Sequence, residues 1–262
     1  MTNKIIGIQG DKLDKINISS DTSIFLAHEA QKLGYKIFYY TPSNLSIIKN
    51  KTYANGVFVK LNYERKKFYK IYKKQKIDVE NLKFILIRQD PPFNSEYLIT
   101  TLILDDLKKT RVINNPVAIR NVSEKLYSKK FTKYMPDTIF SNNIEEVKKF
   151  YKQNKSIIMK PINGHGGNQI HLIKNKFNKK LITNFLKKNG HSMFQKFLKN
   201  ISKGDKRVFI INGKVCGAIS RVPKKGSYLS NMSKGAVPKL TNLTKKEIRI
   251  SKIIGKKLKK DN

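Results

Sequence analysis

The sequence predicts an α/β protein that is built from two units. Its first half opens with an apolar segment, "KIIGI" (4–8), an amphipathic helical stretch and a second apolar segment, "YKIFYY" (35–40). A strand, a helix and a strand in this order are typical of a βαβ unit. The chain has 262 residues, which is enough for one large or two modest domains with a hydrophobic core.

The helix between these two strands is predicted to begin at Ser20 or Asp21, since either side chain can cap its N-terminus, and to end at Gly34. Its expected apolar face comprises Ile24, Ala27, Ala30 and Leu33. The loop before it, residues 9–21, is longer than most connections, and such loops are often functional.

The segment "KTYANGVFVKL" (51–61) is predicted to be a hairpin that turns at Asn55-Gly56, because this dipeptide is a strong turn signal. A buried strand at 82–88 follows and is ended by "QDPPF". A helix at 95–109 and a strand at 111–114 complete the first unit. We interpret residues 1–122 as a Rossmann-like N-terminal domain.

The second unit is predicted to contain several further elements before its last hairpin: helices at 123–134, 143–153 and 178–189, and strands at 138–140 and 192–198. A second Asn-Gly hairpin, "KRVFIINGKVCGAISRV" (206–222), turns at Asn212-Gly213. A long polar loop, 223–240, leads to a basic helix at 244–260. The apolar face of that helix fits a membrane surface or, as we prefer, docking on its own domain. That face comprises Ile250, Ile253, Ile254 and Leu258.

The chain is strongly basic, with 55 Lys and Arg against 18 Asp and Glu and a net charge of +37. Such a surface attracts nucleic acid or anionic membrane. Only seven of these basic residues are arginine, and the lysines are scattered along the chain. Since specific nucleic-acid readers favour arginine, we prefer the codon usage of an AT-rich genome as the explanation.

The single cysteine, Cys216, excludes an internal disulfide and fits a reducing compartment. The first residues, "MTNKIIGIQGDK", contain no apolar core of a signal peptide, and no apolar run approaches the length of a membrane span. We therefore expect a cytoplasmic protein without a membrane partner. The four histidines show no metal-ligand spacing with one another or with Cys216.

The stretch "IIMKPINGHGGNQIHLI" (157–173) carries a glycine-rich loop. In a Walker loop the lysine follows the glycines, and both Walker and Rossmann loops open a helix. Here Lys160 precedes the glycines, and a period-two strand follows them. A hairpin loop of this kind is often only a turn, but exposed backbone N–H groups can also bind phosphate.

The residues around this loop, taken with the early loop and the "RQDPPF" turn, resemble ATP-grasp ligases, and in particular bacterial glutathione synthetases. Matching segments are "INISSDTSIFLAHEAQKLGY", "ILIRQDPPFNSEY", "VINNPVAIRNVSEKLYS", "IIMKPINGHGGNQI", "GDKRVFIING" and "SRVP". The resemblance covers nearly the whole chain and implies an ATP-grasp domain over residues 123–262.

The resemblance implies an ATP- and Mg²⁺-dependent enzyme that joins γ-glutamylcysteine to glycine through an acyl phosphate, usually as a homo-oligomer. It implies two catalytic arginines, Arg207 and Arg221. The implied ATP-binding residues are Lys125, Lys160, Gly164, Gly166, Gly167, Gln195, Lys196, Phe197, Leu198 and Asp205. The implied substrate-binding residues are Asp21, Ser23, Arg88, Asp90 and Asn231.

Several of these residues have a simpler interpretation. Lys125 and Lys160 are two of many lysines, most of which are expected to be solvated. Arg207 could form a weak surface ion pair with Asp205, and Asp90 could be a turn residue.

Two departures from the family pattern bear on activity. An arginine that usually precedes the loop asparagine by two residues is replaced by Leu229. The carboxylate cluster that holds magnesium in the family has no counterpart before Asn262. We therefore expect an incomplete ATP-grasp domain without metal ligands, in a chain truncated at its C-terminus. Such a chain is expected to bind nucleotide weakly and to catalyse poorly. The alternatives are another ATP-grasp carboxylate–amine ligase, or a basic nucleic-acid-binding protein on a degenerate ATP-grasp scaffold.

Overall fold

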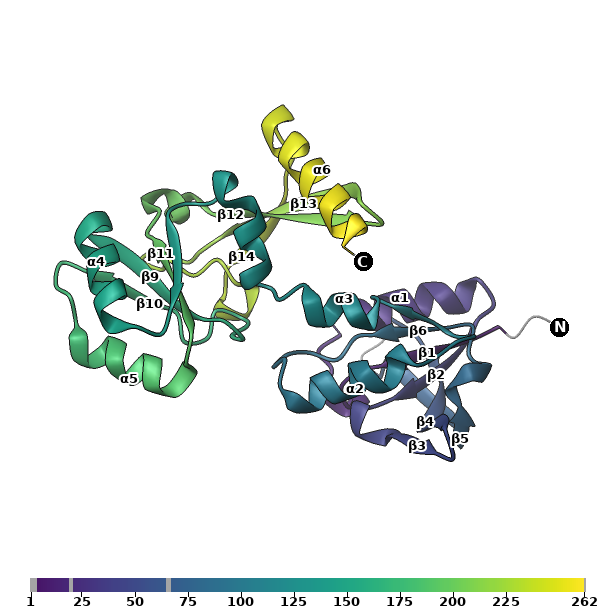
Figure 1. Cartoon of the computed structure of the whole chain (residues 1–262). Helices are drawn as coiled ribbons and strands as arrows, with labels where there is room; N and C mark the ends of the chain where they lie inside the picture. The colour runs from purple at the N-terminus through teal and green to yellow at the C-terminus, as the bar shows by residue number, and fades with distance from the viewer. Residues whose placement is uncertain (1–3, 19–20, 65–66, 262) are drawn as a thin grey trace. The chain divides into compact units, whose positions relative to one another are not determined.

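The computed structural model describes residues 4–18, 21–64 and 67–261. The chain divides into two compact units, Met1–Asn121 and Val122–Asn262, each of which has its own sheets (Figure 1).

The first unit contains, in its described residues, a seven-stranded sheet of order β3-β4-β2-β1-β6-β7, with β5 paired to β4. Strands β2, β1, β6 and β7 are parallel, as a Rossmann-like unit requires, whereas β4 is antiparallel to each of its neighbours β2, β3 and β5. The strands are β1 (Ile5–Gln9), β2 (Lys36–Tyr40), β3 (Leu45–Ile48), β4 (Lys51–Leu61), β5 (Tyr69–Asp78), β6 (Phe84–Ile87) and β7 (Arg111–Ile113). The helices are α1 (Thr22–Lys32), α2 (Ser95–Asp105) and α3 (Pro116–Asn121), with short 3₁₀ turns η1 (Leu13–Lys15), η2 (Pro42–Asn44) and η3 (Val79–Asn81).

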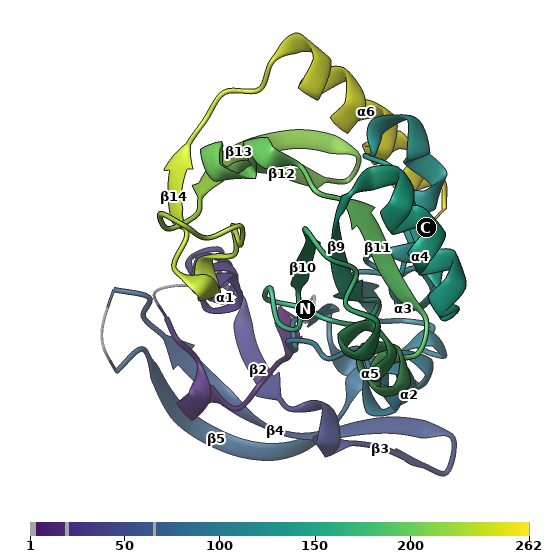
Figure 2. The same ribbon diagram turned by 90° about the vertical axis from the view of Figure 1, so that its left-hand side faces the viewer.

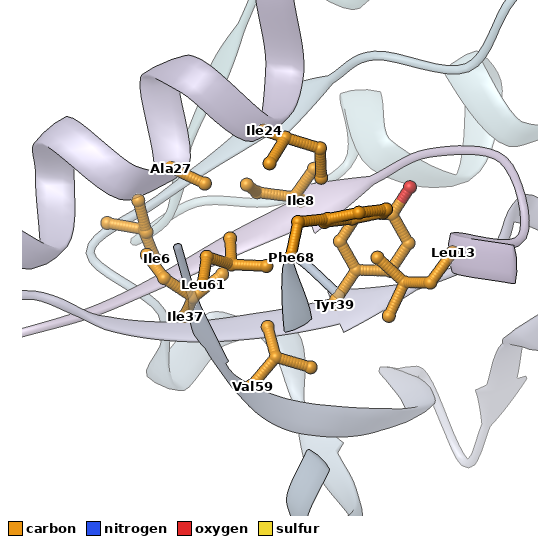
Figure 3. Close-up of a cluster of buried hydrophobic side chains, with 10 residues drawn as sticks. All are labelled: Ile6, Ile8, Leu13, Ile24, Ala27, Ile37, Tyr39, Val59, Leu61 and Phe68. Atoms are coloured by element: carbon orange, nitrogen blue, oxygen red, sulfur yellow. The ribbon is translucent and has the colours of Figure 1, made fainter. Parts of the chain in front are cut away.

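Two apolar clusters pack against this sheet. In the first, side chains from β1, β2 and β4 meet Ile24 and Ala27 of α1 (Figure 3). In the second, Phe38, Phe58 and other sheet residues pack with Leu104 of α2. The alternation of side chains along the strands therefore supplies a core to both faces of the sheet.

The predicted hairpin at Asn55-Gly56 is wrong, because residues 51–61 form one continuous strand, β4. Gly56 serves a close approach instead of a turn: a Cβ there would lie 2.5 Å from Phe38 Cζ and 2.6 Å from the Tyr39 carbonyl oxygen. The turn lies earlier, where Lys49 and Asn50 have positive φ angles of 48° and 60° between β3 and β4.

The first helix begins as predicted, with Asp21 as its N-cap, whereas Ser20 lies outside the described residues. Its apolar face is shorter than predicted, since Leu33 is 72% exposed. Helix α2 ends at Asp105, before the predicted end at residue 109. The backbone N–H groups of Lys108, Lys109 and Thr110 donate hydrogen bonds to the Glu80 carboxylate instead of to helical carbonyls.

The second unit contains two sheets in its described residues: one of order β10-β9-β11-β8 and one of order β12-β13-β14. All of their strand pairs are antiparallel. The strands are β8 (Thr138–Ser141), β9 (Ser156–Pro161), β10 (His171–Lys174), β11 (Ser192–Lys196), β12 (Asp205–Ile211), β13 (Lys214–Val222) and β14 (Val237–Leu240). The helical segments are η4 (Leu126–Tyr134), α4 (Ile144–Asn154), α5 (Lys179–Asn189), η5 (Lys199–Lys203), η6 (Met232–Lys234) and α6 (Lys245–Lys260).

Helices α4 and α5 cover one face of the four-stranded sheet (Figure 1). Met159 of β9 and Phe194 of β11 lie opposite each other on this face and are fully buried. Because side chains alternate along a strand, Lys160 and Gln195 point to the other face. The face that carries Lys160 is therefore not covered by α4 and α5.

Helix α6 packs on the β12–β13 hairpin, which turns at Asn212-Gly213 as predicted (Figure 2). The helix approaches closely at Gly255, where a Cβ would lie 2.8 Å from the Gly213 carbonyl oxygen. Lys206 of β12 forms an ion pair with Glu247 of α6 at 2.9 Å. Docking of this helix on its own domain is thus confirmed, although Ile253 is 37% exposed.

Two sequence predictions for this unit are wrong. The helix expected at 123–134 is a 3₁₀ segment, η4, with a non-helical residue at Phe131. Its side chains make tertiary contacts that outweigh helical propensity, since Tyr127 is buried and donates a hydrogen bond to Asp261 at 2.9 Å. The loop expected at 223–240 ends in a strand, β14, which extends the β12–β13 hairpin to three strands.

No helix in the described part of the chain combines the length and the apolar character that a membrane span requires.

Candidate functional site

Lys160 lies near the end of β9, on the sheet face opposite α4 and α5. Its Nζ donates a hydrogen bond to Gln195 Oε1 at 2.9 Å, and Gln195 Nε2 donates to Thr138 Oγ1 at 2.9 Å. These three residues come from three neighbouring strands, β9, β11 and β8. The Lys160 ammonium is therefore oriented by Gln195 of the neighbouring strand, which Thr138 in turn holds in place.

Lys125 precedes η4, and its side chain is only 13% exposed. Its Nζ donates to the carbonyl oxygens of Ile162 and Gly164, at 3.2 and 2.5 Å. A half-buried ammonium thus supports the start of the glycine-rich loop.

Both lysines have a lowered pKa. Burial is the main cause for Lys125, and the neighbouring Glu124 carboxylate partly opposes it. Burial is also the main cause for Lys160, and the positive charge of Lys125 adds to it. An anion placed near these two ammonium groups would offset both effects.

The glycine-rich loop, residues 162–170, joins β9 to β10 as a strand–loop–strand hairpin, as predicted. Gly166 and Gly167 have positive φ angles of 61° and 78°, which side chains disfavour. Several carbonyl oxygens of this loop accept hydrogen bonds. Among the described contacts, however, the N–H groups of His165, Gly166 and Gly167 donate no hydrogen bond. Consecutive free N–H groups of this kind suit an anion.

The segment 223–236 packs against this loop. A Cβ on Gly167 would lie 2.6 Å from Asn231 Oδ1, so the predicted substrate residue Asn231 contacts the predicted nucleotide loop. Tyr228 donates to the Ile170 carbonyl at 3.4 Å. The hydroxyl of Ser230 is buried and has no hydrogen-bond partner in the described residues. Leu229, which replaces the family's arginine, is partly buried in the same segment.

The predicted adenine connector, Gln195 to Leu198, begins in β11 and leaves the sheet. The N–H groups of Lys196 and Phe197 donate to the carbonyls of Asp137 and Ser156, at 2.9 and 3.0 Å. Leu198 is 53% exposed, and the Phe197 ring lies edge-on to Tyr228. The connector thus exposes the Leu198 side chain, and its Phe197 ring contacts the segment that carries Asn231.

Arg221 and Asp205 form a bidentate ion pair across β12 and β13. Nε and Nη2 of Arg221 donate to the two carboxylate oxygens of Asp205 at 2.8 and 2.7 Å. The suggested pair of Asp205 with Arg207 is wrong, because Asp205 lies opposite Arg221 in the sheet. Arg207 is exposed and has no ion pair among the described residues.

Both arginines lie on the sheet face that α6 leaves uncovered. Lys206 points to α6, so its neighbours Asp205 and Arg207 point away from it. Arg221 shares their face because it is the cross-strand partner of Asp205.

In the first unit, the predicted substrate residues meet at the carboxyl ends of β1 and β6. Asp21 caps α1 by accepting from the N–H groups of Ser23 and Ile24, at 2.7 and 2.9 Å. Arg88 donates to Ser23 Oγ at 3.0 Å and to Thr22 Oγ1 at 2.7 Å. The N–H of Asp90 donates to Asp11 Oδ2 at 2.9 Å.

This edge is also where a doubly wound sheet changes direction, since β1 connects to β2 on one side and β6 to β7 on the other. Ligands of α/β sheets bind at such points.

Sequence reasoning missed three residues of this edge: Asp11, Tyr39 and Tyr97. Tyr39 donates to the Asp11 carbonyl at 2.6 Å, and burial followed by the nearby carboxylates raises its pKa. Burial also raises the pKa of Tyr97, which Arg88 partly counters. The position of Asp11, two residues after the end of β1, was the one signal in the sequence that could have indicated it.

Within residues 4–18, 21–64 and 67–261, no three His, Cys, Asp or Glu side chains gather into a group that could hold a metal ion.

Comparison with known proteins gives consistent matches along the chain. Residues 5–120 match the family model of the prokaryotic glutathione synthetase N-terminal domain, and residues 124–262 match that of the prokaryotic glutathione synthetase ATP-grasp domain.

Among curated relatives, a glutathione synthetase of Mesorhizobium japonicum is 36% identical over 97% of this chain and 82% of its own length. One of Agrobacterium fabrum is 34% identical over 98% of this chain and 82% of its own length. Among solved structures, the ATP-grasp ligase PsnB, complexed with a precursor variant, Mg and ADP, superposes with a TM-score of 0.61. It is 15% identical, and the match covers 98% of this chain and 82% of that one.

Proposed function

The chain belongs to the prokaryotic glutathione synthetase family, and we propose on this basis that it joins γ-glutamylcysteine to glycine in an ATP-dependent ligation. In this reaction ATP phosphorylates the carboxylate of the dipeptide, and the amine of glycine then displaces phosphate. Residues 1–122 would serve as the substrate domain and residues 123–262 as the ATP-grasp domain.

One observation carries the nucleotide part of this proposal. In the glycine-rich loop, carbonyl oxygens accept hydrogen bonds from the protein, whereas three successive N–H groups, those of His165, Gly166 and Gly167, have no described acceptor. Two half-buried ammonium groups are held nearby: Lys125 Nζ donates to a carbonyl of the loop, and Lys160 on β9 is near enough for the charge of Lys125 to lower its pKa. N–H groups and cations in this arrangement fit the triphosphate of ATP.

The two arginines would stabilise the negative charge of the transferring phosphoryl group and the acyl phosphate. Asp205 holds two nitrogens of Arg221, and so leaves Nη1 for a ligand. Arg207, which is exposed and outside any described ion pair, is open to an anion on the same sheet face. Asp205 would act by orienting Arg221.

The remaining predicted residues would bind the adenine and the peptide substrate. Gln195, Lys196, Phe197 and Leu198 would contact the adenine through backbone groups and an apolar side chain. In the first unit, Arg88 would bind a carboxylate of the peptide, while Asp21, Ser23 and Asp90 would line the same edge. Asn231 would contact the substrate from the segment that packs on the glycine-rich loop.

Magnesium is expected to accompany ATP in this family, but the described residues offer no carboxylate cluster for it. The residues present therefore do not fit a protein-held metal ion, and we assign no step to one. A cytoplasmic location and a homo-oligomeric state stay predictions.

The proposal is tested by measuring ADP release and the thermal shift caused by MgATP. ADP should form only when ATP, magnesium, γ-glutamylcysteine and glycine are all present. Lys160→Met, which keeps the length of the side chain but removes its charge, should abolish the MgATP shift. Lys152→Met, at an exposed position of α4, serves as the control and should leave the shift unchanged.

Other outcomes would redirect the assignment. ADP release with a different acid or amine alone would favour another ATP-grasp carboxylate–amine ligase. Tight, salt-sensitive RNA binding without any MgATP shift would favour the nucleic-acid-binding alternative, which rests on the net charge of +37.

A further inference from the structure

The glycine-rich loop is held from two sides. On one side Lys125 binds the carbonyls of Ile162 and Gly164, as described above. On the other side the segment 228–234 contacts the second half of the loop. The first support is a predicted ATP-binding residue, whereas the hydrogen-bond donors of the second, Tyr228, Ser233 and Lys234, have no role in the proposed function.

Two side chains of η6 make this second contact. Ser233 Oγ donates to the Gly166 carbonyl at 3.0 Å, and Lys234 Nζ donates to Asn168 Oδ1 at 2.7 Å. They follow each other in sequence and reach positions 166 and 168, so they flank Gly167.

The contact to Gly166 orients a peptide group. In the peptide unit that joins Gly166 to Gly167, the carbonyl and the N–H point in opposite directions because the unit is planar. Ser233 holds the Gly166 carbonyl, and the Gly167 N–H must therefore point away from η6. That N–H is one of the three that donate no described hydrogen bond.

Further contacts limit the motion of the same segment. Tyr228 contacts the Ile170 carbonyl, and the Asn231 side chain fills the space over Gly167. Within η6, the N–H groups of Lys234 and Gly235 return to the carbonyls of Asn231 and Met232 at 2.9 and 2.8 Å. The two donors thus project from a turn that is itself hydrogen-bonded.

We propose that Ser233 and Lys234 are positioning residues, which lock the glycine-rich loop in the conformation that presents its N–H groups to an anion. The conformational part stands on the contacts of this loop alone. The consequence for ATP affinity rests on the proposed function.

The conformational part is tested by backbone ¹⁵N relaxation of the full chain. In the unaltered protein, the N–H vectors of residues 165–168 should have order parameters near those of a rigid backbone, about 0.8. In the double variant Ser233→Ala/Lys234→Met they should fall to about 0.6 or below. The β9 amides should not change. Equal order parameters in the two proteins would overturn the proposal.

The functional part is tested by titration with MgATP. Loss of two exposed hydrogen bonds should weaken MgATP binding about 5-fold, or about 1 kcal/mol, without lowering the thermal midpoint of the free protein by more than about 2 °C. Ser233→Thr and Lys234→Arg keep the donors and should restore affinity. Lys225→Met lies in the same segment at an exposed position and is the matched control.

The conformational part and the functional part of the proposal can fail separately. If the unaltered chain does not bind MgATP, the proposed function fails, while the relaxation data still decide whether the loop is locked. If the loop loosens and MgATP affinity stays the same, the positioning role is refuted while nucleotide binding stands.

Discussion

Gly167→Ala tests whether the glycine-rich loop requires glycine for its backbone conformation and for its contact with Asn231. Gly167 has a φ of 78°, and a Cβ there would lie 2.6 Å from Asn231 Oδ1 and 3.0 Å from Asn231 Cγ. Gly226 is a matched control in the neighbouring segment: its φ is 80°, and nothing lies within 4 Å of a Cβ placed on it. The two substitutions share the backbone cost and differ in the contact.

The magnitude follows from these two contributions. Alanine in the left-handed region costs about 1 kcal/mol at either position. At Gly167 the methyl group also requires the Asn231 side chain to move by nearly 1 Å, since ordinary contacts begin near 3.4 Å. Rotation of Asn231 away from its preferred conformation adds about 1 kcal/mol. We therefore expect about 2 kcal/mol of destabilisation for Gly167→Ala and about 1 kcal/mol for Gly226→Ala.

Chemical denaturation of both variants measures this difference, with the transition followed by a probe in residues 122–262. MgATP titration provides the second assay, because displacement of Asn231 and Gly167 should lower affinity in Gly167→Ala alone. The reasoning is refuted if the two variants lose the same stability and bind MgATP equally well. That result would mean that the loop adapts freely and that its contact with Asn231 has no energetic weight.

Three further predictions concern single side chains. Lys160→Met should raise the stability of the chain at pH 7 while removing the MgATP shift. The pKa of Lys160 is lowered in the folded state, so the unfolded state binds more protons at pH values between that pKa and about 10.5. In this pH range the free energy of unfolding of the unaltered chain should therefore rise with pH, and that of the variant should rise less. Glu247→Gln should lower the free energy of unfolding by about 0.5 kcal/mol at neutral pH, because the exposed Lys206 and the Thr244 N–H lower the pKa of Glu247 to about 2. Measured by urea denaturation, this difference in stability between the variant and the unaltered chain should vanish as pH falls from 4.5 toward 2. Gly56→Ala should destabilise the first unit by about 2–3 kcal/mol in the same assay, since its Cβ would meet the Tyr39 backbone at 2.6 Å; an unchanged midpoint would contradict the close approach of β2 and β4.

The sequence predicted most of the strand and helix order, since those elements depend on local patterns. Asn55-Gly56 and Asn212-Gly213 show where local patterns stop being sufficient. The same dipeptide forms a turn in the second case and lies inside a strand in the first. The difference is set by Phe38 and Tyr39, which lie on a strand distant in sequence and leave no room for a side chain at Gly56.

The partner of Asp205 illustrates the same limit at the site. The turn at Asn212-Gly213 pairs Ile211 with Lys214, and a regular hairpin continued from there would place Asp205 opposite Ser220. A bulge between Phe209 and Ile210 shifts the register by one residue, so that Asp205 meets Arg221 instead. Sequence reasoning could find the residues but not the bulge that pairs them.

Composition alone also could not separate two lysines from the many others in a chain of net charge +37. What distinguishes Lys125 and Lys160 is burial, which lowers the pKa of both, and the charge of Lys125 lowers that of Lys160 further. Each ammonium is oriented by neutral oxygen atoms, the carbonyls of Ile162 and Gly164 for one and the Gln195 amide for the other. These oxygens fix direction without cancelling charge. The Glu124 carboxylate, 3.8 Å from Lys125 Nζ, is exposed and offsets only part of the positive potential that a ligand would meet. A surface lysine in water gives no comparable selectivity, because its charge is screened and its side chain is mobile. An anion would therefore be attracted to this loop by the two cations held beside it, and the excess of positive charge elsewhere on the chain would add little.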